Sequence, residues 1–146
     1  MALSWCISHP ARLVIAVAKG ELDPQNMIDF VVRIDAANAR PYRKMIDVTG
    51  VTALFSADKI RRFADLIRQR EEEGDVGPIG VVAGSPNVHR QAILFAQHAQ
   101  RHRQIKVFHE QHDARKWLDA AAATTRTDSA YTVRLNATEI RSAVPR

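Results

Sequence analysis

The first candidate for chemistry is Asp47, which ends a short apolar run and is followed by the hydroxyl side chains of Thr49 and Ser56. A carboxylate at the end of a parallel strand can bind a ligand or accept a phosphoryl group, or it can accept the N–H groups of a turn. A phosphoryl-transfer enzyme built on Asp47 would need further acidic side chains on neighbouring strand ends to hold magnesium. The other predicted strand ends read Gly-Ser-Pro at 84–86 and His-Glu at 109–110, so the turn role is favoured.

Two serines are placed where predicted helices begin. Ser56 precedes the apolar stripe of residues 57–73, and Ser85 precedes that of residues 86–102. A serine at such a position caps free backbone N–H groups, a role that contributes about 1 kcal/mol. A phosphate on Ser56 would also be favoured at the positive end of a helix, and a small anion could bind near Ser85 and His89. Capping is sufficient to explain both serines, so regulation at Ser56 and anion binding at Ser85 stand as alternatives.

Five of the six histidines lie in residues 89–112, but their spacing matches no established metal motif. His98 and His102 are one helical turn apart, a spacing that can hold one metal ion. The sequence HEQHD at 109–113 is one residue short of the HExxH zinc signature. The single cysteine, Cys6, has no partner for a disulfide and no activating base nearby in the sequence. We therefore expect no metal ion and no cofactor.

Composition and charge exclude several function classes. The net charge is +5, but the basic residues are spread over several predicted elements and alternate with acidic ones. A nucleic-acid-binding protein more often concentrates its positive charge on one face and adds exposed aromatic side chains. The early apolar run at 13–18 is too short for a signal peptide or a membrane span. We expect a cytoplasmic protein that binds neither nucleic acid nor membrane.

Segments typical of strands and helices alternate along the chain. Asp23 and Pro24 are a typical helix start, because aspartate caps free N–H groups and proline fits the first helical position. Gly20 is expected to end the strand before it. The patterns predict strands at 3–8, 12–18, 42–48, 79–83 and 105–108. They predict helices at 24–39, 57–73, 86–102 and 112–122.

Strands that alternate with single helices form crossover units, which build a mainly parallel sheet with helices on both faces. The first two strands are separated only by a turn at His9-Pro10, so they should pair as an antiparallel hairpin. The prediction is an α/β domain over 1–122, with a mainly parallel five-stranded sheet, an N-terminal antiparallel hairpin strand and about four helices.

Residues 123–146 differ in composition and are predicted to be a C-terminal extension. It begins with a linker-like segment, TTRTDS, and continues with YTVRL, which alternates like a strand. A short strand or helix here could add to a sheet edge in its own subunit or in a second one. The extension therefore favours a homodimer, and a loosely held tail is the alternative.

The order of these elements resembles a known family. The segments RLVIAVAKGEL, YRKMIDVTGV, PIGVVAG and VFHEQHDARKWL follow one another as in STAS-type domains. More narrowly, they are similar to the bacterial single-domain proteins that resemble anti-sigma-factor antagonists, the SpoIIAA-like family, whose architecture is related to the lipid-binding CRAL-TRIO domains. The resemblance covers about residues 4–121. It implies a STAS-like fold and a regulatory role without catalysis.

The phosphorylated antagonists of this family begin the helix after the third strand with Asp-Ser-Ser-Gly, where the second serine is the acceptor. Aligned with that motif, this chain has Phe55, Ser56, Ala57 and Asp58. Only Ser56 matches, and Ala57 stands where the acceptor hydroxyl would be. A shift of one residue would make Ser56 the acceptor, so the resemblance leaves its phosphorylation open.

Three functions follow as hypotheses. The first is a non-enzymatic regulatory or protein-interaction module whose partner is an unknown protein, with Asp47, Thr49, Ser56, Ser85 and His89 on its regulatory or ligand-facing surface. The second is a carrier or sensor of a small apolar or amphipathic ligand, by analogy with the CRAL-TRIO relatives, which requires an internal pocket. The third is a phosphoryl-transfer enzyme using Asp47.

Overall fold

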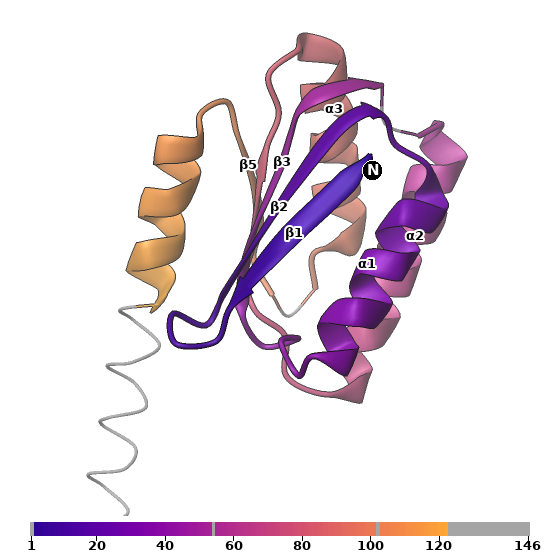
Figure 1. Cartoon of the computed structure of the whole chain (residues 1–146). Helices are drawn as coiled ribbons and strands as arrows, with labels where there is room; N and C mark the ends of the chain where they lie inside the picture. Colours follow the sequence, from indigo (N-terminus) through magenta and orange to yellow (C-terminus); the bar gives the residue numbers. More distant parts are fainter. Residues whose placement is uncertain (1, 54, 102, 123–146) are drawn as a thin grey trace, which may run out of the picture.

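Five strands form one sheet whose spatial order is the order of the chain, β1-β2-β3-β4-β5. Figure 1 labels β1, β2, β3 and β5 in this order across the sheet. The computed structural model describes residues 2–53, 55–101 and 103–122. The strands are β1 (Leu3–Ser8), β2 (Leu13–Glu21), β3 (Arg43–Ala53), β4 (Ile79–Val82) and β5 (Ile105–Phe108). Strand β1 pairs with β2 in the antiparallel direction, and every other pair of neighbours is parallel. The predicted α/β class and hairpin are confirmed.

The helices lie unequally on the two faces of the sheet (Figure 1). They are α1 (Pro24–Ala36), α2 (Ala57–Arg70) with a short 3₁₀ turn η1 (Glu71–Glu73), α3 (Pro86–Ala99) and a last helix at 111–122. Each of the first three connects two neighbouring parallel strands, and every crossover steps in the same direction across the sheet. Because such crossovers are right-handed, α1, α2 and α3 all lie on one face. The helix at 111–122 follows the last strand and covers the other face.

The alternation of side chains along the strands divides the interior into two apolar layers. In β2, Val14 and Ala16 belong to the layer under α1, α2 and α3. Leu13, Met45 and Val82 belong to the second layer, where they pack with Ala114 and Leu118 of the last helix. Gly80 lies in this second layer too, where a Cβ would be 3.6 Å from Leu118.

Several predicted element ends are wrong, for local backbone reasons. Gly20 does not end β2: it lies within the strand at φ +71°, where the pairing with β3 is irregular. Helix α1 ends at Ala36 rather than near Ala39, because Asn38 adopts a left-handed conformation with φ 58°. Strand β3 continues to Ala53, beyond the predicted end at residue 48, and α3 ends at Ala99.

The predicted extension at 123–146, including its strand-like segment and the dimer contact it could make, lies outside the described residues. Within the part of the chain that the structure describes, no helix is long and apolar enough to cross a membrane.

Candidate functional site

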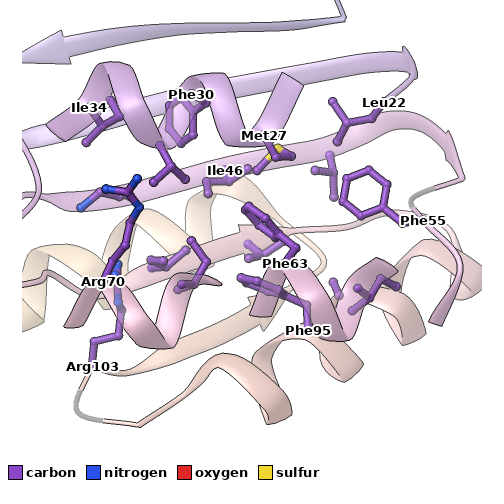
Figure 2. Close-up of a pocket in the computed structure, with 18 of the residues that line it drawn as sticks. Leu22, Met27, Phe30, Ile34, Ile46, Phe55, Phe63, Arg70, Phe95 and Arg103 are labelled. Atoms are coloured by element: carbon purple, nitrogen blue, oxygen red, sulfur yellow. The ribbon is translucent and has the colours of Figure 1, made fainter. Parts of the chain in front are cut away.

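A cavity of about 80 Å³ lies in the first apolar layer, between α1, α2, α3 and the sheet (Figure 2). Its walls come from the inward stripes of the helices and from alternate strand residues. Figure 2 shows the side chains of Met27, Phe30 and Ile34 on one side of it and that of Phe63 on the other. The apolar lining consists of Leu22, Met27, Phe30, Val31, Ile34, Ile46, Val48, Phe55, Ile60, Phe63, Ile67, Ile79, Val81, Ala92 and Phe95.

Aromatic side chains make one end of this cavity. Phe63 stacks on Phe95 with ring centroids 5.5 Å apart, and it meets Phe55 edge-on at 6.4 Å. Phe30 is braced from behind by Trp5 of β1, at 5.2 Å in an edge-on arrangement. Such pairs hold the rings in defined positions and present apolar faces to the cavity.

The other end of the cavity is ionic. Asp35, next to the last residue of α1, accepts a hydrogen bond from Arg40 Nε at 3.0 Å and forms a short ion pair with Arg70 at the end of α2. Glu73 lies 3.5 Å from Arg40 and 3.9 Å from Arg70. All of these except Glu73 line the cavity, so its polarity changes from one end to the other.

Arg103 completes the ionic end from the segment before β5. Its side chain is 5% exposed, its Nε lies 3.5 Å from Glu71 Oε1, and one terminal nitrogen donates to the carbonyl of Gly77 at 3.3 Å. Burial lowers the pKa of Arg103, whereas the Glu71 carboxylate raises it. Only glycine fits at position 77 without a backbone shift, because a Cβ there would lie 2.3 Å from the carbonyl oxygen of Tyr42.

Lys44 of β3 contributes a buried ammonium group to this end. It is 6% exposed and donates to the carbonyl oxygens of Arg40 at 2.6 Å and Tyr42 at 2.7 Å. Burial, and after it the positive charge of Arg103, lower the pKa of Lys44 to about 7. Among the described residues, no carboxylate forms an ion pair with Lys44.

The predicted site around Asp47 has a structural explanation. Asp47 is 5% exposed and lies inside β3, at its last pairing with β4, rather than at the end of the strand. One carboxylate oxygen accepts the backbone N–H of Thr49 at 2.9 Å and its hydroxyl at 2.7 Å; the other accepts a short hydrogen bond from Gln111. Burial raises the pKa of Asp47, but these hydrogen bonds outweigh it and hold the pKa below its usual value. The carboxylate therefore ties β3 to the start of the last helix.

The two serines cap helices, as their positions predict. Ser56 accepts the N–H of Lys59 at 3.4 Å, and Ser85 accepts the N–H of Val88 at 3.3 Å. His89, in the first turns of α3, stacks on His109 with ring centroids 4.1 Å apart. Partial burial lowers the pKa of His89, and His109 lowers it further.

The structure brings together only some of the residues predicted from the sequence. Asp47 and Thr49 are bonded to each other, and a Cβ on Gly84 would lie 3.7 Å from Thr49. None of Asp47, Thr49, Ser56, Ser85 and His89 lines the cavity. In the described ranges, no three His, Cys, Asp or Glu side chains are grouped so that they could hold a metal ion, and His102 lies outside these ranges.

The ionic end of the cavity was not predicted, although one signal for it exists. Lys44 alternates with Ile46 and Val48 along β3, so the pattern places a lysine on an otherwise apolar face. A charged side chain at such a position is rarely buried without a function or a partner. Arg70 and Arg103 give no comparable signal, because only the tertiary fold brings them to the same place.

Comparisons with known proteins agree with this architecture. No protein-family model matches the chain, and no curated protein matches it either. The solved structures that match include that of an uncharacterised DUF3478-family protein with a SpoIIAA-like fold from Shewanella loihica PV-4, which matches with a TM-score of 0.55. The match covers 80% of this chain and 93% of the other at 14% identity, so it is informative for fold alone. Together with the five-stranded sheet and its antiparallel edge strand, it shows that this chain has a SpoIIAA-like fold.

Proposed function

We propose that this protein is a non-enzymatic regulatory module that senses or carries a small amphipathic ligand. The observation that carries the proposal is the cavity between the sheet and α1, α2 and α3, apolar along most of its lining and ionic at one end. Binding sites for small molecules combine these two features, an apolar wall and a few convergent polar groups. A cytoplasmic location, expected from the sequence, is part of the proposal.

The size of the cavity limits the ligand. Sites for drug-sized molecules usually enclose about 300–1,000 Å³, and an engineered apolar cavity of about 150 Å³ admits benzene. The cavity here is about 80 Å³. The ligand is therefore a short hydrocarbon chain with a polar head, and longer chains require rotation of side chains such as Met27 or Phe95 that line the cavity.

A chain-length series tests this proposal. Straight-chain alcohols and carboxylates from butyl to decyl are titrated by calorimetry and by the shift in unfolding temperature. A ligand that binds only the folded state raises that temperature with its concentration. We expect saturable binding in at least one series, with an optimum at a short chain set by the depth of the cavity. If neither series binds, the cavity is part of the core and the proposal is wrong.

A cavity-filling variant provides the control. Ala92 lines the cavity from α3, so Ala92→Leu should occupy part of its volume and abolish binding. Ala96 lies on the same helix but outside this cavity, so Ala96→Leu should bind as the wild type does. Binding that survives Ala92→Leu would place the ligand elsewhere.

A second candidate is a protein-interaction module that docks through the start of α2. Ser56 and the residues after it, Ala57 and Asp58, are exposed there, so a modification would change an accessible surface. Partner capture from lysate with the wild type and with Ser56→Asp tests this candidate. Recovery of one protein by the wild type alone supports it; recovery of no specific protein by either form argues against it.

A further inference from the structure

We infer that the ligand of the cavity is a monoanion, a short-chain carboxylate whose head group lies between Arg70 and Arg103 and whose hydrocarbon chain points toward Leu22 and Phe55. The inference rests on the proposed function, since it names the chemistry of the ligand for the same cavity. Unpaired hydrogen-bond donors, charge balance and polarity support it separately.

Two arginine nitrogens at the ionic end make no hydrogen bond to any residue that the structure describes. Arg70 Nε is buried without any partner among the described residues. Arg103 Nε is also buried without a hydrogen bond, and its contact with Glu71 Oε1 at 3.5 Å is an ion pair only. Buried donors are nearly always satisfied in folded proteins, so Arg70 Nε indicates a missing acceptor, whereas Arg103 Nε has the Glu71 carboxylate at ion-pair distance. Figure 2 shows both arginine side chains together at this end of the cavity.

The charges of the described residues at the ionic end do not balance. Four cationic side chains lie there beside three carboxylates. The cations are Arg40, Lys44, Arg70 and Arg103, and the carboxylates are Asp35, Glu71 and Glu73. With Lys44 protonated, the described groups carry one excess positive charge. A single carboxylate would balance it, and the guanidinium groups of arginine match a carboxylate in both charge and shape.

The direction of the ligand follows from the polarity of the lining. Every ionisable side chain among the described lining residues belongs to the ionic end. The opposite end, near Leu22 and Phe55 in Figure 2, offers only apolar side chains to the cavity. A charged head group there would be buried without a partner, which is strongly unfavourable.

Lys44 makes the binding of an anion dependent on pH. Its ammonium is surrounded by the positive charges of Arg40 and Arg103 and by the carboxylate of Asp35, and its pKa is lowered to about 7. A bound carboxylate would favour the charged ammonium, so binding above pH 7 requires uptake of a proton. The affinity of the carboxylate should therefore fall as the pH rises from 7 to 9, and that of a neutral ligand should not.

Four hexyl compounds test the head group: hexanoate, hexyl phosphate, hexanol and hexylamine, titrated by calorimetry into the full chain at pH 6.5. We expect hexanoate to bind at least about tenfold more tightly than hexanol, a modest preference for charge-assisted hydrogen bonds. Hexyl phosphate should bind more weakly than hexanoate, because its second charge is not balanced. Hexylamine should not bind.

Each other result has a distinct meaning. Equal affinity for hexanoate and hexanol would overturn the anion and leave the proposed function standing. Tighter binding of hexyl phosphate would overturn the carboxylate. If no hexyl compound binds although the chain-length series finds another ligand, the inferred ligand is wrong; if that series also fails, the proposed function fails with it.

Substitutions locate the head group. Arg70→Gln should reduce the preference for hexanoate to less than about threefold, because it removes a guanidinium beside the head group. Arg68→Gln, which changes a half-exposed arginine two residues earlier on α2 that does not line the cavity, should leave the preference unchanged. Lys44→Met should abolish the pH dependence of hexanoate binding. This variant provides the test if Arg70→Gln does not fold. Unchanged preference and unchanged pH dependence in these variants would overturn the inference.

Discussion

Lys44 Nζ lies 2.7 Å from the carbonyl oxygen of Tyr42, so a charged side chain is held inside the apolar layer by backbone carbonyls rather than by a carboxylate. Burial, together with the nearby positive charge of Arg103, lowers the pKa of Lys44 from 10.5 to about 7. Between these two values the unfolded chain binds a proton that the folded chain lacks, so stability rises with pH across this window. Below pH 7 both states are protonated and the full cost of burial is present.

The substitution Lys44→Met should therefore stabilise the protein, relative to the wild type, by an amount that grows as the pH falls. Relative to the wild type, its free energy of unfolding should be higher at pH 6 than at pH 10 by as much as about 3–5 kcal/mol, since each unit of pKa shift corresponds to about 1.4 kcal/mol. Urea unfolding at several pH values measures the difference. Lys59→Met, at an exposed position of α2, is the control and should follow the pH dependence of the wild type. A constant difference between Lys44→Met and the wild type would contradict the low pKa.

Gly77→Ala should destabilise the protein by about 2–3 kcal/mol, a typical cost of overpacking. A Cβ at Gly77 would lie 2.3 Å from the carbonyl oxygen of Tyr42, and the backbone would have to move. The same movement would disturb the carbonyl that holds Lys44. Gly84→Ala is the matched control, because its Cβ would make ordinary contacts at 3.7 Å with Thr49. Thermal unfolding of the two variants compares them, and equal stability would argue against the close approach at Gly77.

Asp47→Asn should destabilise the protein by about 1–3 kcal/mol, because an amide cannot accept from both Thr49 and Gln111 without leaving a donor unpaired. The low pKa of Asp47 gives the sign of the pH effect. The Asp47 carboxylate contributes to the free energy of unfolding above the pKa that it has in the unfolded state. This contribution is lost as the pH falls through its lower pKa in the folded state. The deficit of Asp47→Asn, its loss of stability relative to the wild type, should therefore shrink in acid, as followed by urea unfolding from pH 7 down to about pH 2.

The control for Asp47 is an exposed aspartate. Asp58 is 82% exposed in its side chain and forms only a loose ion pair with Arg61 at 3.6 Å. Asp58→Asn should change stability by less than about 0.5 kcal/mol. If Asp47→Asn is equally mild, the hydrogen bonds of Asp47 do not hold the last helix to β3.

Ser56→Ala should cost about 1 kcal/mol, the usual value of a helix cap. Ser56→Asp should retain the cap, because its carboxylate accepts the same N–H of Lys59 and is favoured at the positive end of the helix. Thermal unfolding of both variants separates capping from any effect on partner capture. No loss of stability in Ser56→Ala would show that the cap at Ser56 contributes nothing, and an equal loss in both variants would show that aspartate does not retain it.

The order of helices and strands was predictable because each of them has a strong local signal in the sequence. Pro24 and Ser56 mark helix starts that the structure contains, and β5 has the predicted bounds. The ends that were missed depend on single backbone angles, at Gly20 and Asn38, which hydrophobic periodicity does not encode. The unequal covering of the sheet follows from the order of the strands, and that order becomes known only with the fold.

The candidate site was less predictable because its parts are far apart in the sequence. Arg70 closes α2 and Arg103 precedes β5, and nothing in the residues around either one indicates burial. Asp47, by contrast, stood out in the sequence because a carboxylate follows an apolar run. Its hydrogen bonds to Thr49 explain that position structurally.

The most direct test of the central claim uses the two described methionines. Met27 lines the cavity, and Met45 is equally buried in the layer on the other face of the sheet. Hexanoate is titrated into protein labelled with ¹³C at the methionine methyl groups, and the two signals are followed by NMR. The account predicts a saturable shift of the Met27 signal and none for Met45. An unchanged Met27 signal, or equal shifts of both, would contradict it.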